Sequence, residues 1–142
     1  MSINNSESKT SEVVFEYKGV AYGTVPEDMT ILRFHHGITK IPDCLFTSFS
    51  KLREVVLNDC IVEIGKYAFG RCTSLESITF PSTMVKIDIH AFDNCPRLRN
   101  VVLNEGLRKI GNSAFIGCSS LEHITIPSTV TEIDNLKNAI IY

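Results

Sequence analysis

A repeat of 23 residues constrains the fold of this chain more than any local pattern does. The stretch "CTSLESITFPSTMVKIDIHAFDNC", Cys72 to Cys95, places its apolar residues at neither the helical period of 3.6 nor the strand period of 2. The next stretch, "CPRLRNVVLNEGLRKIGNSAFIGC", Cys95 to Cys118, repeats the same skeleton. Self-similarity at such a period is typical of an array of stacked units. The sequence therefore predicts a solenoid.

Equivalent positions of the repeat form apolar columns. Five units, here called coils 1 to 5, begin at Met29, Leu52, Leu75, Leu98 and Leu121. Two of the columns are Leu32, Val55, Ile78, Val101 and Ile124 at the fourth position, and Phe46, Phe69, Phe92 and Phe115 at the eighteenth. Each coil is too small to close a core alone, so stacking is expected to bury these columns against one another.

Three segments of each coil have a local prediction. The first, "LESITF" in coil 3, alternates inward and outward and is rich in β-branched residues, which predicts one strand per coil in one parallel sheet. "VKI" and its equivalents predict a second short extended piece. "KYAFGRC", with Ala68 and Phe69 pointing inward, predicts a short helical turn on the other side.

These residues resemble a known family. The pattern L-x-x-I-x-x-P-x-x-V-x-x-I-x-x-x-A-F-x-x-C, present as "LESITFPSTMVKIDIHAFDNC", is similar to the BspA-type leucine-rich repeat, and the resemblance covers Met29 to Tyr142. It implies an α/β solenoid, a right-handed leucine-rich-repeat coil with a parallel β-sheet on one face and short helical turns on the other. It also implies a recognition role in general terms, since many relatives are surface proteins or adhesins.

The segments at the two ends are expected to differ from the coils. Residues 1–11 are predicted to be a disordered tail and residues 12–28 an N-terminal β cap, built like a hairpin with its turn at Lys18 and Gly19. Residues 29–142 are predicted to be the solenoid of five coils, the last incomplete. Its final segment "NLKNAIIY" is interpreted as an atypical cap, a truncation, or an edge for self-association.

A second period of 46 residues lies over the first. Coils 2 and 4 share "LR-x-VVLN" and "IG", whereas coils 3 and 5 share "LE-x-IT-x-PST" and "ID". The second position of coils 2 to 5 alternates between arginine and glutamate as a result. Strands about 4.8 Å apart would place these opposite charges side by side, and we expect this charge column to favour the correct register. Descent from a duplicated two-coil unit would explain the pattern equally well. The column consists of Arg53, Glu76, Arg99 and Glu122.

Charge and hydropathy argue against several partner classes. A formal net charge of -2 gives no long-range attraction to phosphate or anionic lipid, so nucleic acid is not expected as a partner. No apolar run approaches the roughly 20 residues needed to cross a bilayer, and "MSINNSESKT" has no features of a signal peptide. We therefore expect no membrane insertion, no cofactor, and a cytoplasmic location by default.

The cysteines are predicted to be free thiols. Their number is odd and no Cys-x-x-Cys pair occurs, which fits neither a disulfide framework nor a closed zinc site. Three of them share the repeat position of Phe49, so they are predicted to be buried packing residues. The five are Cys44, Cys60, Cys72, Cys95 and Cys118.

One small cluster has the residue types of a catalytic site. His36 and Asp59 share the eighth position of adjacent coils, and Cys60 follows, so a base, an orienting carboxylate and a thiol could lie in one patch. A His-Cys metal site is a second alternative. Because no coil supplies an oxyanion hole or a substrate cleft, we interpret the patch as a solvated turn, with no catalytic residue and no metal ligand.

The outward positions of the predicted sheet form a mixed polar and apolar face. Such an extended face suits a protein interface, although strand propensity alone would also place β-branched residues there. The candidate protein-binding residues are Ile31, Arg33, His35, Glu54, Val56, Asn58, Asn100, Val102, Asn104 and His123.

The sequence therefore predicts a non-enzymatic protein-binding or scaffolding module that recognises an unidentified protein partner through its strand-bearing face. A structural or adhesive spacer segment of a larger surface protein is the alternative. A thiol enzyme using Cys60, His36 and Asp59 is a third hypothesis.

Overall fold

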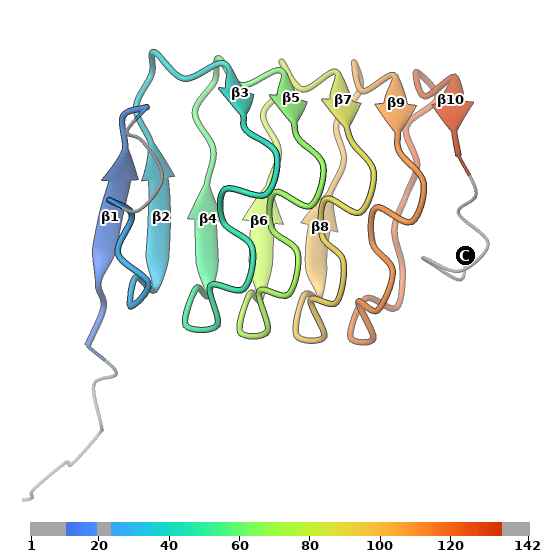
Figure 1. The fold of residues 1–142 in the computed structure, drawn as a ribbon. Coiled ribbons are helices and arrows are strands. Elements are labelled where there is room, and N and C mark those ends of the chain that lie inside the picture. The colour runs from blue at the N-terminus through green and yellow to red at the C-terminus, as the bar shows by residue number, and fades with distance from the viewer. Residues whose placement is uncertain (1–10, 20–23, 135–142) are drawn as a thin grey trace, which may run out of the picture.

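The computed structural model describes residues 11–19 and 24–134, and it is a solenoid whose coils stack side by side (Figure 1). Two parallel five-stranded sheets run along it. The first sheet contains β1 (Val14–Tyr17), β2 (Ile31–Phe34), β4 (Glu54–Val56), β6 (Ser77–Thr79) and β8 (Asn100–Val102). The second contains β3 (Lys40–Ile41), β5 (Glu63–Ile64), β7 (Lys86–Ile87), β9 (Lys109–Ile110) and β10 (Glu132–Ile133). The parallel sheet and the second extended piece are both confirmed.

Identical repeat positions lie side by side, as the columns predict. In the first sheet Val55 pairs with Leu32 on one side and with Ile78 on the other. The phenylalanine column forms a buried stack in which the rings of Phe69 and Phe92 are 5.5 Å apart and 9° from parallel. Burying a side chain of this size stabilises the fold by about 1.5–3 kcal/mol. Stacking therefore supplies the core that no single coil could build.

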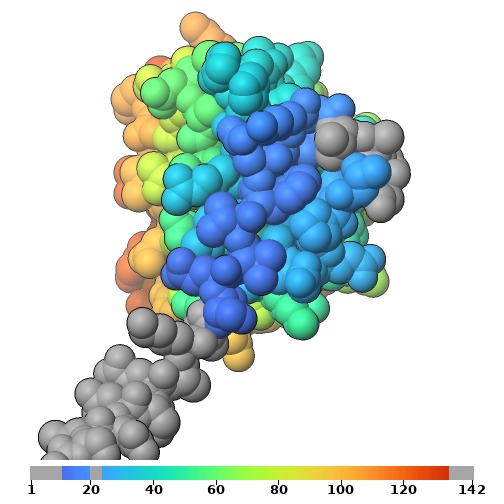
Figure 2. Space-filling view, turned by 90° about the vertical axis from the view of Figure 1, so that its left-hand side faces the viewer, coloured from blue at the N-terminus to red at the C-terminus, as the bar shows by residue number. Residues whose placement is uncertain are grey.

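The N-terminal cap contains a strand in the direction of the coils, and the second half of the predicted hairpin includes residues 20–23, which lie outside the described residues. β1 pairs with β2 in parallel, with Phe15 beside Leu32. Tyr17 is buried and its ring meets those of Phe34 and Phe46 edge-on, at 5.8 and 5.6 Å. The cap thus takes the direction that lets Phe15 and Tyr17 extend the apolar columns. It covers the N-terminal end of the array (Figure 2).

The expected helical turns are not helical, since no helix occurs among residues 11–19 and 24–134. Ala68 and Phe69 are fully buried as predicted, but Tyr67 and Arg71 beside them have φ values of 52° and 58°, which a right-handed helix does not contain. Their N–H groups bond to the next coil instead, which gives a ladder of hydrogen bonds between coils in addition to those of the two sheets. The donors Tyr67, Phe69 and Arg71 reach the carbonyls of Ile89, Ala91 and Asp93 at 3.1, 2.9 and 2.6 Å.

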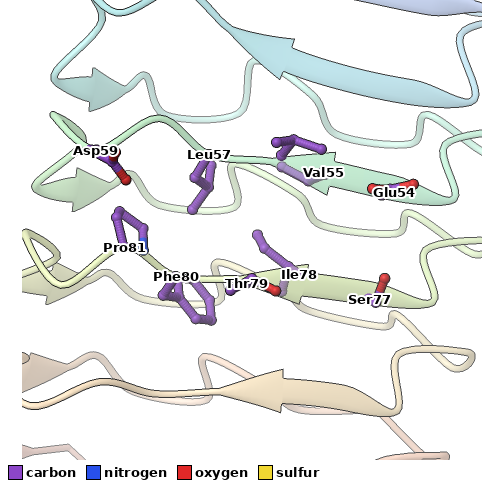
Figure 3. Close-up of a pocket in the computed structure, with 10 residues that line it drawn as sticks. Glu54, Val55, Leu57, Asp59, Ser77, Ile78, Thr79, Phe80 and Pro81 are labelled. Carbon is purple, nitrogen blue, oxygen red and sulfur yellow. The ribbon is translucent and has the colours of Figure 1, made fainter.

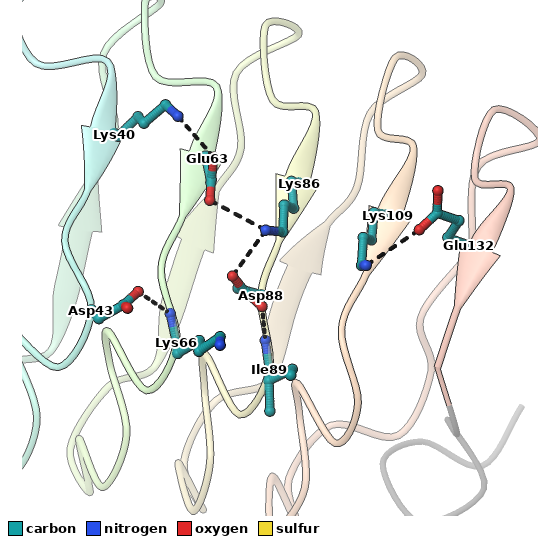
Figure 4. A network of polar contacts seen from close by, with 9 residues as sticks. All are labelled: Lys40, Asp43, Glu63, Lys66, Lys86, Asp88, Ile89, Lys109 and Glu132. Atoms are coloured by element: carbon teal, nitrogen blue, oxygen red, sulfur yellow. Dashed lines mark hydrogen bonds and ion pairs between the residues drawn. The ribbon is translucent and has the colours of Figure 1, made fainter.

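Charged side chains form a network on the second sheet (Figure 4). Glu63 pairs with Lys40 at 3.2 Å and with Lys86 at 3.4 Å. Lys86 and Lys109 are neighbours of like charge in the register of β7 and β9. Asp88 offsets this repulsion because its carboxylate pairs with Lys86 at 3.0 Å.

The last coil is only partly formed by strands. β10 pairs with β9, but the first segment of coil 5, residues 121–126, contains no strand, so the prediction of one strand per coil in the first sheet fails there. Within the part of the chain that the structure describes, this segment has a neighbouring coil on one side only. The predicted tail lies outside the described residues except for Ser11, and so does the predicted C-terminal edge, residues 135–142.

Candidate binding surface

The first sheet carries most of the predicted binding residues on its outer side. Arg33 and Glu54 are exposed, Val56 is half-buried, and Val102 is 58% exposed. His123 is exposed too, but it lies in the segment of coil 5 that forms no strand. The structure thus places these side chains along one face, and their role in binding stays a prediction.

Two of the predicted residues have a structural role that the sequence did not reveal. The side-chain amide of Asn58 donates to the carbonyls of His35 and Ile38 in the preceding coil, at 2.6 and 3.0 Å. Asn104 donates in the same way to the carbonyl of Phe80. These amides hold neighbouring coils together, so they have less freedom to contact a partner.

A hollow of about 360 Å³ lies over β4 and β6 (Figure 3). Glu54 and Asp59 lie at its two ends, with Leu57 between them. Ser77 and Thr79 of β6 are small, which leaves the space open between longer neighbours. The lining residues are Glu54, Val55, Val56, Leu57, Asp59, Ser77, Ile78, Thr79, Phe80 and Pro81. The predicted binding set omits Asp59, Ser77, Thr79 and Pro81, although the change from long to small side chains at the outward positions of coil 3 is a signal in the sequence.

A second, smaller hollow of about 90 Å³ adjoins the first, and the two share Glu54 and Ser77. The charge column predicted from the sequence is partly present, because Glu76 pairs with Arg53 at 3.9 Å and with Arg99 at 3.4 Å. Its fourth member, Glu122, forms no ion pair with a described residue. The lining residues are Glu12, Thr30, Ile31, Arg53, Glu54, Glu76 and Ser77.

The residues of the candidate thiol site are not connected. His36, Asp59 and Cys60 are all exposed, and no hydrogen bond between described side chains joins any two of them. The His36 ring lies 4.0 Å from that of His35, and the Cys60 N–H donates to the Asn58 side chain at 2.7 Å. In the described part of the chain, no group of three or more His, Cys, Asp or Glu side chains could hold a metal ion.

The cysteine column is buried in the core, as predicted. All five cysteines are free, and Cys72, Cys95 and Cys118 are the buried ones. Each buried thiol donates to a phenylalanine carbonyl of the preceding coil, as Cys72 does to Phe46 at 3.2 Å. Burial raises the pKa of the Cys72 thiol to about 12, so this group is a protonated packing residue at neutral pH.

The family model described as BspA type leucine rich repeat region matches residues 3–138 with six copies. The chain belongs to the BspA-type leucine-rich repeat family. The sixth copy is one more than the five coils counted from Met29, in agreement with β1 extending the array before coil 1. No curated protein is significantly similar to the chain.

Solved structures of other leucine-rich repeat proteins share this BspA-type fold. The T. pallidum leucine rich repeat protein TpLRR is 29% identical with a TM-score of 0.71, over 73% of this chain and 51% of its own. A leucine-rich repeat protein from Bacteroides ovatus is 30% identical with a TM-score of 0.63, over 75% and 30%. One from Eubacterium ventriosum is 27% identical with a TM-score of 0.66, over 75% and 28%. The chain thus spans about half or less of these relatives. Among its described residues no helix is both long and apolar enough for a membrane span.

Proposed function

We propose that this chain is a non-enzymatic module that binds another protein through the outer face of the first sheet. The observation that carries the proposal is the hollow over β4 and β6. Its volume of about 360 Å³ leaves room for side chains of a partner to enter the face of the sheet. Solenoids use such extended faces for recognition, and this face also exposes Val102, an apolar side chain that a partner could cover.

The residues around the hollow support binding rather than catalysis. A hydroxyl nucleophile needs a base within hydrogen-bond reach, and Ser77 and Thr79 have no histidine among the residues that line the hollow with them. Asp59 lines the hollow, but His36 and Cys60 do not. The hollow therefore lacks the set of groups that the thiol enzyme interpretation requires.

Site-specific photo-crosslinking tests the proposal. A photoreactive residue at the exposed Thr79 should capture one specific protein from an extract of the cells that make this chain. The matched control carries the same residue at Arg108, which is exposed next to β9 on the second sheet. Equal capture from both positions, or capture from Arg108 alone, would overturn the assignment of binding to the first sheet.

A structural or adhesive spacer is the second candidate. Its support is that the chain spans 51% or less of each of the similar structures described above, so an array of this kind can be one section of a longer one. A spacer needs no partner on the strand face. Changing Val56 and Val102 to Lys would abolish binding by a recognition module, while a spacer would keep its function.

A further inference from the structure

The hollow over β4 and β6 has a carboxylate at each end and no positively charged side chain in its lining. Glu54 lies where β4 begins, and Asp59 lies in the turn that follows it, at the opposite end in Figure 3. No lysine, arginine or histidine lines the hollow. Neither carboxylate takes part in an ion pair with another residue of the described chain. A cationic group at either end would therefore meet a carboxylate that has no competing partner.

The adjoining hollow adds to the negative charge. Of its charged lining residues, Glu76 is occupied by Arg53 and Arg99, whereas Glu12 forms no ion pair with any described residue. Arg33 is the register neighbour of Val56, yet it lines neither hollow. The two hollows together thus have four carboxylates and one arginine, Arg53, among their lining residues.

The middle of the larger hollow is neutral and partly apolar. Leu57 and Thr79 lie between the two carboxylates in Figure 3, and Val56 lines the hollow as well. Glu54 and Asp59 are five positions apart, which is at most about 17 Å of extended chain. In an extended segment, residues i, i+2 and i+4 face the same side and span about 13 Å, and long basic side chains at the ends cover the difference.

We infer that this hollow binds an extended segment of a partner protein in which two basic residues, four positions apart, flank a small apolar residue. The inference rests on the proposed binding role of the first sheet, and it adds the chemistry of the partner. One basic side chain pairs with Glu54 and the other with Asp59, while the apolar residue between them covers Val56.

Peptide titration followed by NMR tests this inference. The probe is the synthetic peptide Ac-GKTVTKG-NH2, and its matched control is Ac-GETVTEG-NH2. The lysine peptide is expected to shift the backbone N–H signals of Val56 and Thr79 and to bind at least tenfold more tightly than the glutamate peptide at low salt. Equal affinities, tighter binding of the glutamate peptide, or shifts confined to other surfaces would overturn it.

Matched variants separate site recognition from the general attraction between opposite charges. Glu54→Gln with Asp59→Asn should remove the preference for the lysine peptide. Glu27→Gln with Asp28→Asn changes the net charge equally at exposed positions outside both hollows, and it should leave the preference intact. An equal loss in both double variants would overturn the inference. If Thr79 crosslinks a protein while the peptide preference is absent, only the basic segment is refuted; the absence of specific crosslinking refutes the proposed function itself.

Discussion

The side-chain amide of Asn58 donates a hydrogen bond to the backbone carbonyl of His35 in the preceding coil, at 2.6 Å. At the equivalent position coil 3 has Pro81, which has no amide to donate. There the junction is bridged two residues later, where the Thr83 hydroxyl donates to the carbonyl of Ile61 at 2.8 Å. The period of 46 residues therefore has a structural counterpart, because successive junctions between coils alternate between an asparagine and a threonine bridge.

Asn58→Ala is expected to lower the free energy of unfolding by about 1–3 kcal/mol. The substitution leaves the partly buried carbonyl of Ile38 without the amide that satisfies it, while the His35 carbonyl keeps its bond from the Ile38 N–H. Asn100→Ala is the control, because Asn100 is exposed on β8, and its cost should stay within about 0.5 kcal/mol. Urea denaturation measures both, and similar losses in the two variants would contradict the bridging role of Asn58.

Arg99→Glu should lower the melting temperature by about 2–4 °C at low salt. Glu76 lies between Arg53 and Arg99, so the reversal replaces an attraction by a repulsion between neighbouring strands. In 1 M salt the effect should shrink, because the screening length falls to about 3 Å.

The control for this reversal is Arg97→Glu, since Arg97 is exposed and forms no ion pair with the described residues. Calorimetry at both salt concentrations measures the two variants. A melting temperature for Arg99→Glu that is unchanged at low salt as well as at high salt would refute a contribution of the charge column to register.

Asp88→Asn should make stability less dependent on acid pH. Burial alone would raise the pKa of Asp88, but the Ile89 N–H and the Lys86 ammonium hold this pKa below its usual value. The charged carboxylate therefore stabilises the fold above about pH 4, and the contribution is lost as the pH falls through the lowered pKa. The hydrogen bond to Asp88 raises the pKa of Lys86. The charged lysine therefore stabilises the fold until the pH rises through that raised pKa.

The measurement is the difference in unfolding free energy between the natural chain and Asp88→Asn across pH 2 to 9. We expect about 1 kcal/mol at pH 7, falling toward zero below pH 4. Asp28→Asn, which removes an exposed carboxylate that forms no ion pair in the described structure, should show a difference near zero throughout. A penalty for Asp88→Asn that persists unchanged at pH 2 would contradict the assignment.

The sequence predicts the sheets well because burial recurs at fixed positions. Val55 and Ile78 are buried neighbours, as their shared column requires. The sequence predicts the structure less well wherever contacts between coils override the local preference of the residues. "VVFEY" has the composition of a strand, but nothing in it states whether the strand runs parallel or antiparallel to β2. Tyr67 adopts a positive φ, which its residue type does not favour, because its N–H group bonds to the next coil.

The same limit applies to the candidate surface. Alternation identifies Glu54 and Val56 as outward residues, since side chains on a strand alternate between faces. It does not reveal that Asn58 turns its amide onto the preceding coil, or that small side chains at Ser77 and Thr79 open a hollow. These features depend on the relative sizes and orientations of residues from two coils, which become visible only when the coils are stacked.

Thiol labelling of the native protein at pH 8 should give two fast cysteines and three slow ones. Cys44 and Cys60 are exposed, whereas the other three are buried. Burial blocks access to Cys72 and raises its pKa to about 12, which leaves almost no reactive thiolate. The slow group should react only as fast as the protein unfolds, and a third fast thiol would contradict the buried column.

Cys60→Ser is the informative variant in this experiment. It should remove one fast thiol and leave the three slow ones unchanged, because Cys60 lies on an exposed turn outside the core. Labelling at pH 6 then compares the two exposed thiols in the natural chain. Similar rates for Cys60 and Cys44 support a solvated turn. A rate for Cys60 more than tenfold higher, reduced by His36→Ala, would show that the imidazole activates the thiol and would favour the enzyme interpretation.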